Sequence, residues 1–173
     1  MEGNTLALEQ IQKWMAKPNS EKNMLIYHGT AGIGKTYLCA ALTDWCFEKF
    51  NDFRYWKEED ILRKLRLGIS EGKGDYLHNL RSFVDTQLLI LDDVGSGINP
   101  EKFSNRDLEF RREVFYSLLD YRYNAMLPTI ITSNFSKQEF EIVYSKRITS
   151  RLFASENTDI EVLDGQDKRK LGY

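Results

Sequence analysis

Runs of apolar and aromatic residues only four or five long alternate along this chain with longer stretches of helical spacing. Runs of this length are typical of strands, and they lie at residues 24–27, 53–56, 87–91, 129–132 and 160–163. Between them, apolar residues recur every three or four positions. This spacing predicts helices at about 4–15, 35–50, 61–67, 76–83, 106–124, from 136 onward, and 147–153. Strands that alternate with helices predict an α/β domain built on a parallel sheet.

Three of the expected helices carry further local signals. The first has one apolar face and ends before Pro18, so we expect residues 1–22 to form an N-terminal helix and linker and 23–173 the main domain. Ser136 and Glu139 have the spacing of a capping box, which predicts a helix start there. The inward face of the helix over 35–50 is expected to carry Leu38, Ala41, Leu42 and Trp45.

Composition restricts the functional classes. The chain has 173 residues, enough for one domain with its own core, and its net charge of −2 excludes a globally basic coat for nucleic acid. No apolar stretch approaches the roughly 20 residues of a membrane span, and the first residues lack a signal-peptide pattern. We therefore expect a soluble, cytoplasmic domain without membrane contact. Cys39 and Cys46, the two cysteines, are expected to be buried thiols on one helix.

The residues after the first strand match a phosphate-binding loop. The pattern G-x-x-x-x-G-K-[ST] is fitted by Gly29, Thr30, Ala31, Gly32, Ile33, Gly34, Lys35 and Thr36. Glycines allow successive backbone N–H groups to turn towards phosphate oxygens, and the next helix directs its positive N-terminal end at the same anion. In such loops the lysine reaches the β- and γ-phosphates and the hydroxyl ligates Mg²⁺. The alternative, a plain glycine-rich turn, does not explain why a strand precedes the loop and a helix follows it.

Two aspartates, Asp92 and Asp93, end the most apolar run of the chain. Ligands of open α/β sheets bind at the carboxyl ends of the strands. Asp92 is expected in the Mg²⁺ shell, directly or through water, and Asp93 is expected to polarise the attacking water. Aspartates at strand ends also occur in ordinary turns, but the phosphate loop upstream favours the catalytic interpretation.

Four other polar residues have two interpretations each. Asn134 ends another apolar run, where its amide either holds the attacking water or forms a turn. Arg147 and Arg151 are four residues apart and share a helix face. That spacing fits a salt-bridged surface and also fits an arginine finger inserted into the ATP site of a neighbouring subunit. Arg169 is either a solvated charge or a sensor of the γ-phosphate.

Together these motifs resemble the AAA+ ATPase domain of the DnaC/DnaI-type replicative helicase loaders and of the related IstB-type transposition helper ATPases. The resemblance extends from about Leu25 to Lys170 and rests on the segments GTAGIGKT, LLILDDVG, TIITSN, RITSRL and GQDKRK. The doubled aspartate followed by a small hydrophobic residue and glycine is closer to this family than to AAA+ proteins at large, which usually carry Asp-Glu.

The resemblance implies a P-loop NTPase fold with three αβα layers and a five-stranded parallel sheet in the order 5-1-4-3-2. It also implies ATP and Mg²⁺ as cofactors. By position, Lys35 and Thr36 match the Walker A motif, and Asp92 and Asp93 match the Walker B motif. Asn134 matches sensor 1 and Arg169 matches a sensor 2-like arginine. Arg151 matches the arginine finger, with Arg147 beside it. Tyr37, directly after the loop, is expected to join the nucleotide contacts.

The chain departs from the family pattern in two places. Asp167 stands where the C-terminal segment usually has serine, which weakens the assignment of Arg169. The loaders usually carry an additional N-terminal domain that grips the helicase, whereas here 28 residues precede the loop. An isolated ATPase domain and a compact relative both fit this observation. No C-terminal lid domain is expected.

In relatives, helices between the second and third strands line a pore that binds single-stranded DNA. Residues 54–81 here contain seven basic and five acidic residues. The candidates for phosphate contacts are Lys57, Arg63, Lys64 and Arg66, with Tyr55, Trp56 or Tyr76 stacking on bases. A solvated helix face is the alternative, and core positions are favoured for Tyr55 and Trp56.

The leading hypothesis is an ATP-hydrolysing switch that assembles with copies of itself on single-stranded DNA and helps to load a DnaB-type replicative helicase. Hydrolysis is expected to be weak and to depend on assembly. The alternatives are a transposition helper acting on duplex DNA, a P-loop small-molecule kinase, and a binding module that does not hydrolyse nucleotide. His28, next to the phosphate loop, is expected to be a packed residue at a strand end, and a contact with the nucleotide is the alternative.

Overall fold

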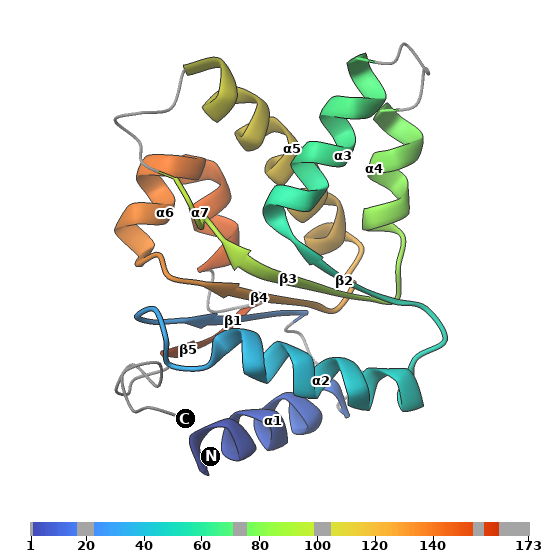
Figure 1. Cartoon of the computed structure of the whole chain (residues 1–173), viewed down its shortest axis with the longest axis vertical. Coiled ribbons are helices and arrows are strands. Elements are labelled where there is room, and N and C mark those ends of the chain that lie inside the picture. Colours follow the sequence, from blue (N-terminus) through green and yellow to red (C-terminus); the bar gives the residue numbers. More distant parts are fainter. Residues whose placement is uncertain (1, 17–22, 71–75, 99–104, 154–157, 163–173) are drawn as a thin grey trace.

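The computed structural model describes residues 2–16, 23–70, 76–98, 105–153 and 158–162. Helices and strands alternate along the chain (Figure 1). The strands are β1 (Met24–His28), β2 (Phe53–Lys57), β3 (Leu88–Val94), β4 (Thr129–Ser133) and β5 (Thr158–Val162). The helices are α1 (Glu2–Met15), α2 (Lys35–Lys49), α3 (Glu58–Ser70), α4 (Tyr76–Val84), α5 (Asn105–Asn124), α6 (Lys137–Tyr144) and α7 (Lys146–Leu152).

The strands form one sheet in the order β2-β3-β4-β1-β5, and every neighbouring pair is parallel. The expected order β1-β4-β3-β2 is confirmed, and β5 lies on the outer side of β1. Figure 1 shows α1 and α2 on one face of the sheet and α3 to α7 on the other. Because all strands are parallel, the segments that follow β1, β3 and β4 leave the sheet at the same edge.

Alternation along the strands divides the buried residues into two cores. Successive side chains of a strand point to opposite faces. In β1, Met24 and Ile26 therefore join the core under α3 to α7, while Leu25 and Tyr27 join the core under α1 and α2. This is why the strand runs read as continuously apolar: both faces of the sheet are covered.

Most local predictions are confirmed, with small shifts at element ends. The Ser136–Glu139 capping box is present, and Cys39 and Cys46 are buried. Helix α3 begins at Glu58, earlier than expected, with three acidic residues in its first turn, where they complement the positive end of the helix. No helix within the described ranges is long and apolar enough to cross a membrane.

The expectation for Ala41 is wrong, because this residue is exposed rather than facing inward. The buried face of α2 consists of Leu38, Cys39, Leu42 and Cys46, together with Lys35 at the start of the helix. At 100° per residue, Ala41 points more than a quarter of a turn away from the mean direction of the four buried apolar residues. The two cysteines, not Ala41, complete the apolar stripe.

A buried arginine fixes the amino ends of β3 and β4. Arg122 of α5 has no exposed surface, and its guanidinium donates to the carbonyl oxygens of Val84, Thr86 and Pro128 at 2.6–2.8 Å and to Thr129 Oγ1 at 2.8 Å. Burial lowers the pKa of Arg122 to about 10, so the side chain is still charged at neutral pH. One side chain therefore joins the end of α4 and the starts of two strands.

We predict that Arg122→Met destabilises the protein by about 3 kcal/mol or more, because buried carbonyl groups lose their donors. Urea denaturation measures the free energy of unfolding. Arg106→Met, an exposed position near the start of the same helix, is the control and should change it by no more than about 0.5 kcal/mol. Equal losses in the two variants would contradict a stabilising role of this network.

Candidate nucleotide site

The phosphate loop joins the end of β1 directly to the start of α2. Gly34 is the N-cap of α2 and has a φ of 104°, a left-handed conformation that favours glycine. The first turn of α2 contains no acidic residue, so its positive end is not neutralised by the chain itself. The main chain of Gly29 donates to the Ser133 carbonyl oxygen at 3.3 Å, which attaches the loop to the end of β4.

Lys35 lies within the loop rather than on the surface. Its side-chain ammonium donates to the carbonyl oxygens of Gly29 at 2.7 Å and Thr30 at 2.8 Å, and the residue is 7% exposed. The positive charge is therefore held beside the loop backbone. Thr36 and Tyr37 follow on the exposed side of the first turn. This arrangement agrees with the phosphate-binding interpretation of the sequence.

Asp92 is completely buried, and both of its carboxylate oxygens accept hydrogen bonds. The Tyr55 hydroxyl donates to one oxygen at 2.7 Å and the Thr132 hydroxyl to the other at 2.5 Å. Tyr55 lies on β2 and Thr132 on β4, the two strands that flank β3. The carboxylate is thus held from both sides of its own strand.

The charge of Asp92 also influences its neighbours. Burial, followed by the hydrogen bond to Asp92, raises the pKa of the Tyr55 hydroxyl above its usual range. Burial, followed by the Asp92 charge, raises the pKa of the Cys39 thiol well above its usual range. Both groups therefore remain protonated at neutral pH, and the tyrosine stays a donor to Asp92.

Asp93 leaves the strand geometry that Asp92 keeps. Its φ is 59°, and the β3–β4 register shifts between Leu91 and Val94, so Asp92 and Asp93 together lie opposite Thr132 in a bulge. The Asp93 N–H donates to Thr132 Oγ1 at 3.0 Å, and the Asn134 amide donates to Asp93 Oδ1 at 3.4 Å. The structure thus brings together Asp93 and Asn134, as their positions at neighbouring strand ends suggest.

The two arginines of α7 form a second group, supported by α5. Arg151 forms an ion pair with Asp120 at 2.7 Å, and its guanidinium also lies 5.3 Å from the ring of Tyr116. Arg147 lies over the same ring at 4.1 Å. The Arg151–Asp120 ion pair fits the salt-bridged interpretation of this helix face. Arg169 lies outside the described residues.

The four candidate DNA-binding residues do not form one common stripe. Lys57 is exposed at the end of β2, and Arg63 pairs with Asp60 at 2.7 Å on α3 itself. Lys64 lies over the rings of Trp56 and Phe83, at 5.3 and 5.4 Å. Arg66 pairs instead with Asp107 of α5 at 2.8 Å.

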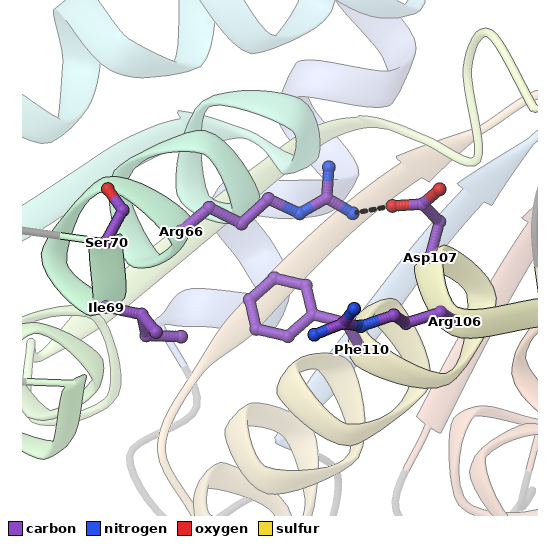
Figure 2. Close-up of a pocket in the computed structure, with 6 residues that line it drawn as sticks. All are labelled: Arg66, Ile69, Ser70, Arg106, Asp107 and Phe110. Atoms are coloured by element: carbon purple, nitrogen blue, oxygen red, sulfur yellow. Dashed lines mark hydrogen bonds and ion pairs between the residues drawn. The ribbon is translucent and has the colours of Figure 1, made fainter.

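Arg66 also lines a shallow pocket between the end of α3 and the start of α5. Figure 2 shows this pocket, which is lined by Arg66, Ile69, Ser70, Arg106, Asp107 and Phe110. The Arg66 guanidinium lies 5.1 Å from the Phe110 ring. An arginine beside an aromatic ring is the combination that stacks on bases and pairs with phosphates.

Sequence reasoning missed two functional hydroxyls. Tyr55 and Trp56 pack against the two cores, as the sequence predicts, but the Tyr55 hydroxyl also donates to Asp92. Thr132 was assigned only to a strand. Polar groups on the strands flanking Asp92 are the signal that would have identified both, once the strand order is known. His28 packs edge-on against Phe153 at 6.2 Å, as expected, and burial followed by the Lys35 charge lowers its pKa.

Several known proteins are similar to this chain in sequence. The family described as IstB-like ATP binding proteins matches residues 13–153. The replicative helicase loader DnaI of Bacillus subtilis is 28% identical over 125 residues, which are 71% of this chain and 37% of DnaI. The chromosomal replication initiator DnaA of Onion yellows phytoplasma is 25% identical over 164 residues, which are 93% of this chain and 30% of that protein. The chain spans about a third of the length of these relatives.

Solved structures show the fold. The DnaC helicase loader has a TM-score of 0.73 at 24% identity, over 92% of this chain and 89% of that chain. AMPPCP-bound DnaA from Aquifex aeolicus has a TM-score of 0.73 at 20% identity, over 98% of this chain and 49% of that chain. The expected AAA+ fold is thereby confirmed. Since the family match covers residues 13–153, most of the chain, the chain belongs to the IstB-like ATP-binding protein family and is similar in sequence to the helicase loader DnaI and to DnaA.

Proposed function

We propose that this chain hydrolyses ATP with Mg²⁺, binds single-stranded DNA and helps to load a replicative helicase. One observation carries the proposal. The carboxyl ends of β1, β3 and β4 meet at one edge of the sheet. The phosphate loop with Lys35, the buried Asp92 and the Asp93–Asn134 pair all lie at this edge. ATP binding is a property of the family, and this edge is where ligands of open α/β sheets bind.

The oxygen donors at this edge fit Mg²⁺. This ion keeps several waters and uses one or two protein oxygens in addition to phosphates. The Thr36 hydroxyl, exposed in the first turn of α2, and the Asp92 carboxylate form such a set. Because both Asp92 oxygens already accept from hydroxyl groups, we infer that Asp92 holds waters of the magnesium shell rather than the ion itself. Bound Mg²⁺ neutralises charge on the β- and γ-phosphates.

Asp93 and Asn134 are suited to orient the attacking water. Asp93 is less buried than Asp92, and the amide of Asn134 donates to it. A water between the Asp93 carboxylate and the γ-phosphate would be polarised by the carboxylate and positioned by the neutral amide. The amide adds no negative charge beside the phosphate.

The arginine finger role is proposed for Arg151 acting on a second copy of the chain. Its guanidinium is partly exposed, with a side-chain exposure of 27%, and is supported by Asp120 and Tyr116. A side chain held in this way costs less entropy to present to a neighbour than a free one. Assembly and ATP hydrolysis would then be linked.

The DNA and helicase parts of the proposal rest on relatives and on α3. DnaI is named a replicative helicase loader, and one DnaA structure of similar fold was solved with AMPPCP and single-stranded DNA. Lys57, Arg63, Lys64 and Arg66 remain our candidates for DNA contacts, together with Phe110 and Arg106 of the neighbouring pocket. Preference for duplex DNA over single strands would favour a transposition helper instead.

We predict that Lys35→Ala weakens binding of Mg²⁺–ATP at least about tenfold, because the charge beside the phosphate loop is lost. Titration with a fluorescent ATP analogue measures the Kd. Lys49→Ala, at the exposed end of the same helix, should bind like the parent protein. An unchanged Kd in Lys35→Ala would refute nucleotide binding at this loop.

Asp93→Asn is expected to retain ATP binding, whereas its kcat for ATP hydrolysis should fall by about 100-fold or more, because a positioned general base contributes about that much to the rate. Phosphate release measured at saturating ATP gives kcat, and the titration above gives the Kd. Asp44→Asn, an exposed residue of α2, serves as the control. Parent-like kcat in Asp93→Asn would remove Asp93 from the reaction.

In the parent protein, the ATPase rate per protomer should rise with protein concentration and with single-stranded DNA. Arg151→Ala should abolish the dependence on concentration, with a loss of about 1,000-fold at full assembly, because the finger stabilises transition-state charge in trans. Lys146→Ala, an exposed position at the start of the same helix, is the control and should retain that dependence. A rate independent of concentration and DNA, and unchanged in Arg151→Ala, would disprove the composite site.

A further inference from the structure

A buried carboxylate outside the motifs described above holds the turn that follows Asp93. Glu58 is the first residue of α3 and is 2% exposed. One of its oxygens accepts from the Gly95 main-chain N–H at 2.9 Å and forms an ion pair with Arg111 of α5 at 2.5 Å. The other accepts from the Tyr144 hydroxyl of α6 at 2.6 Å. Four segments of the chain therefore meet at this one group.

The ion pair explains how a charge is tolerated there. Burial raises the pKa of Glu58, and the Arg111 guanidinium is the largest of the influences that oppose this rise. A buried ion pair contributes little net stability compared with apolar residues of the same size, so it is weak evidence for a stabilising role. The geometry of the pair is more informative, because the Glu58 oxygen that pairs with Arg111 also accepts from the Gly95 N–H.

That N–H belongs to the turn that positions Asp93. Gly95 has a φ of 83°, and a Cβ atom built on it would lie 2.4 Å from the ring of Phe135, so only glycine fits. The turn is closed by a bond from the Ser96 N–H to the Asp93 carbonyl oxygen at 3.0 Å. Phe135 directly follows Asn134. Glu58 thus holds the Asp93–Ser96 turn through Gly95, which packs on its other side against Phe135.

We propose that Glu58 is a positioning residue for hydrolysis, which through the Gly95 N–H fixes the Asp93 carboxylate relative to Asn134. The proposal rests on the proposed ATPase function. A carboxylate that must align a water with a phosphorus atom loses about 100-fold in rate when misplaced by about 1 Å. The phosphate loop has no part in this turn, so ATP binding is independent of Glu58.

Two double variants test this role. Glu58→Met with Arg111→Met removes both charges and the acceptor for Gly95, whereas Glu58→Gln with Arg111→Met removes both charges and keeps an acceptor. We expect the first to lose kcat at least about tenfold with a Kd for Mg²⁺–ATP within twofold of the parent. The second should retain kcat within about threefold. Thermal melting shows whether each variant is folded at the assay temperature.

The outcomes separate the two proposals. A parent protein that binds ATP without hydrolysing it refutes the proposed function. An active parent whose two double variants are equally active, or equally impaired, overturns the role of Glu58, because the acceptor would then make no difference. Phe135→Leu loosens the same turn from its other side and should lower kcat without changing the Kd. It keeps the test decisive if the first double variant does not fold, since parent-like kcat in Phe135→Leu also overturns the proposal.

Discussion

The carboxylate of Asp92 is completely buried, and the strands around it must supply its hydrogen bonds. A buried carboxylate is very costly unless hydrogen bonds replace its lost hydration. Tyr55 and Thr132 supply those bonds from the two strands beside β3. This requirement ties the ends of three strands together. Asp92 and Asp93 share a bulge in which Asp93 has a positive φ, so the two adjacent aspartates face different surroundings.

Helix α5 supports the elements around this site through polar side chains. Arg111 reaches Glu58 and Glu59 at the start of α3, and Arg112 donates to the carbonyl oxygens of Ile142 and Val143 at the end of α6. Further along, Asp120 and Tyr116 hold the arginines of α7. The helix that carries candidate DNA contacts and the helix that carries the candidate finger therefore share one support.

The structural features that depend on residues close together in the sequence could be predicted. The phosphate loop, the aspartate pair and the capping box at Ser136 each depend on a few consecutive positions, because the backbone and side chains that interact are close in sequence. The strand order of β1 to β4 came from the family resemblance and is confirmed. The face of α2 was predicted less well: Ala41 is exposed, because small residues and cysteines leave the centre of the apolar stripe ambiguous.

The sequence by itself determined the phosphate loop, the acidic strand end and the alternation of strands and helices, since each is a local pattern of residue types. Only the tertiary structure decided which hydroxyls bind Asp92, that Lys64 lies on Trp56 while Arg66 turns to α5, and that Glu58 reaches Gly95. The physical reason is separation along the chain. The hydrogen bonds and the ion pair join residues 37 to 41 positions apart, and Lys64 of α3 lies on a ring of β2. Their partners are therefore set by packing around the sheet rather than by local spacing.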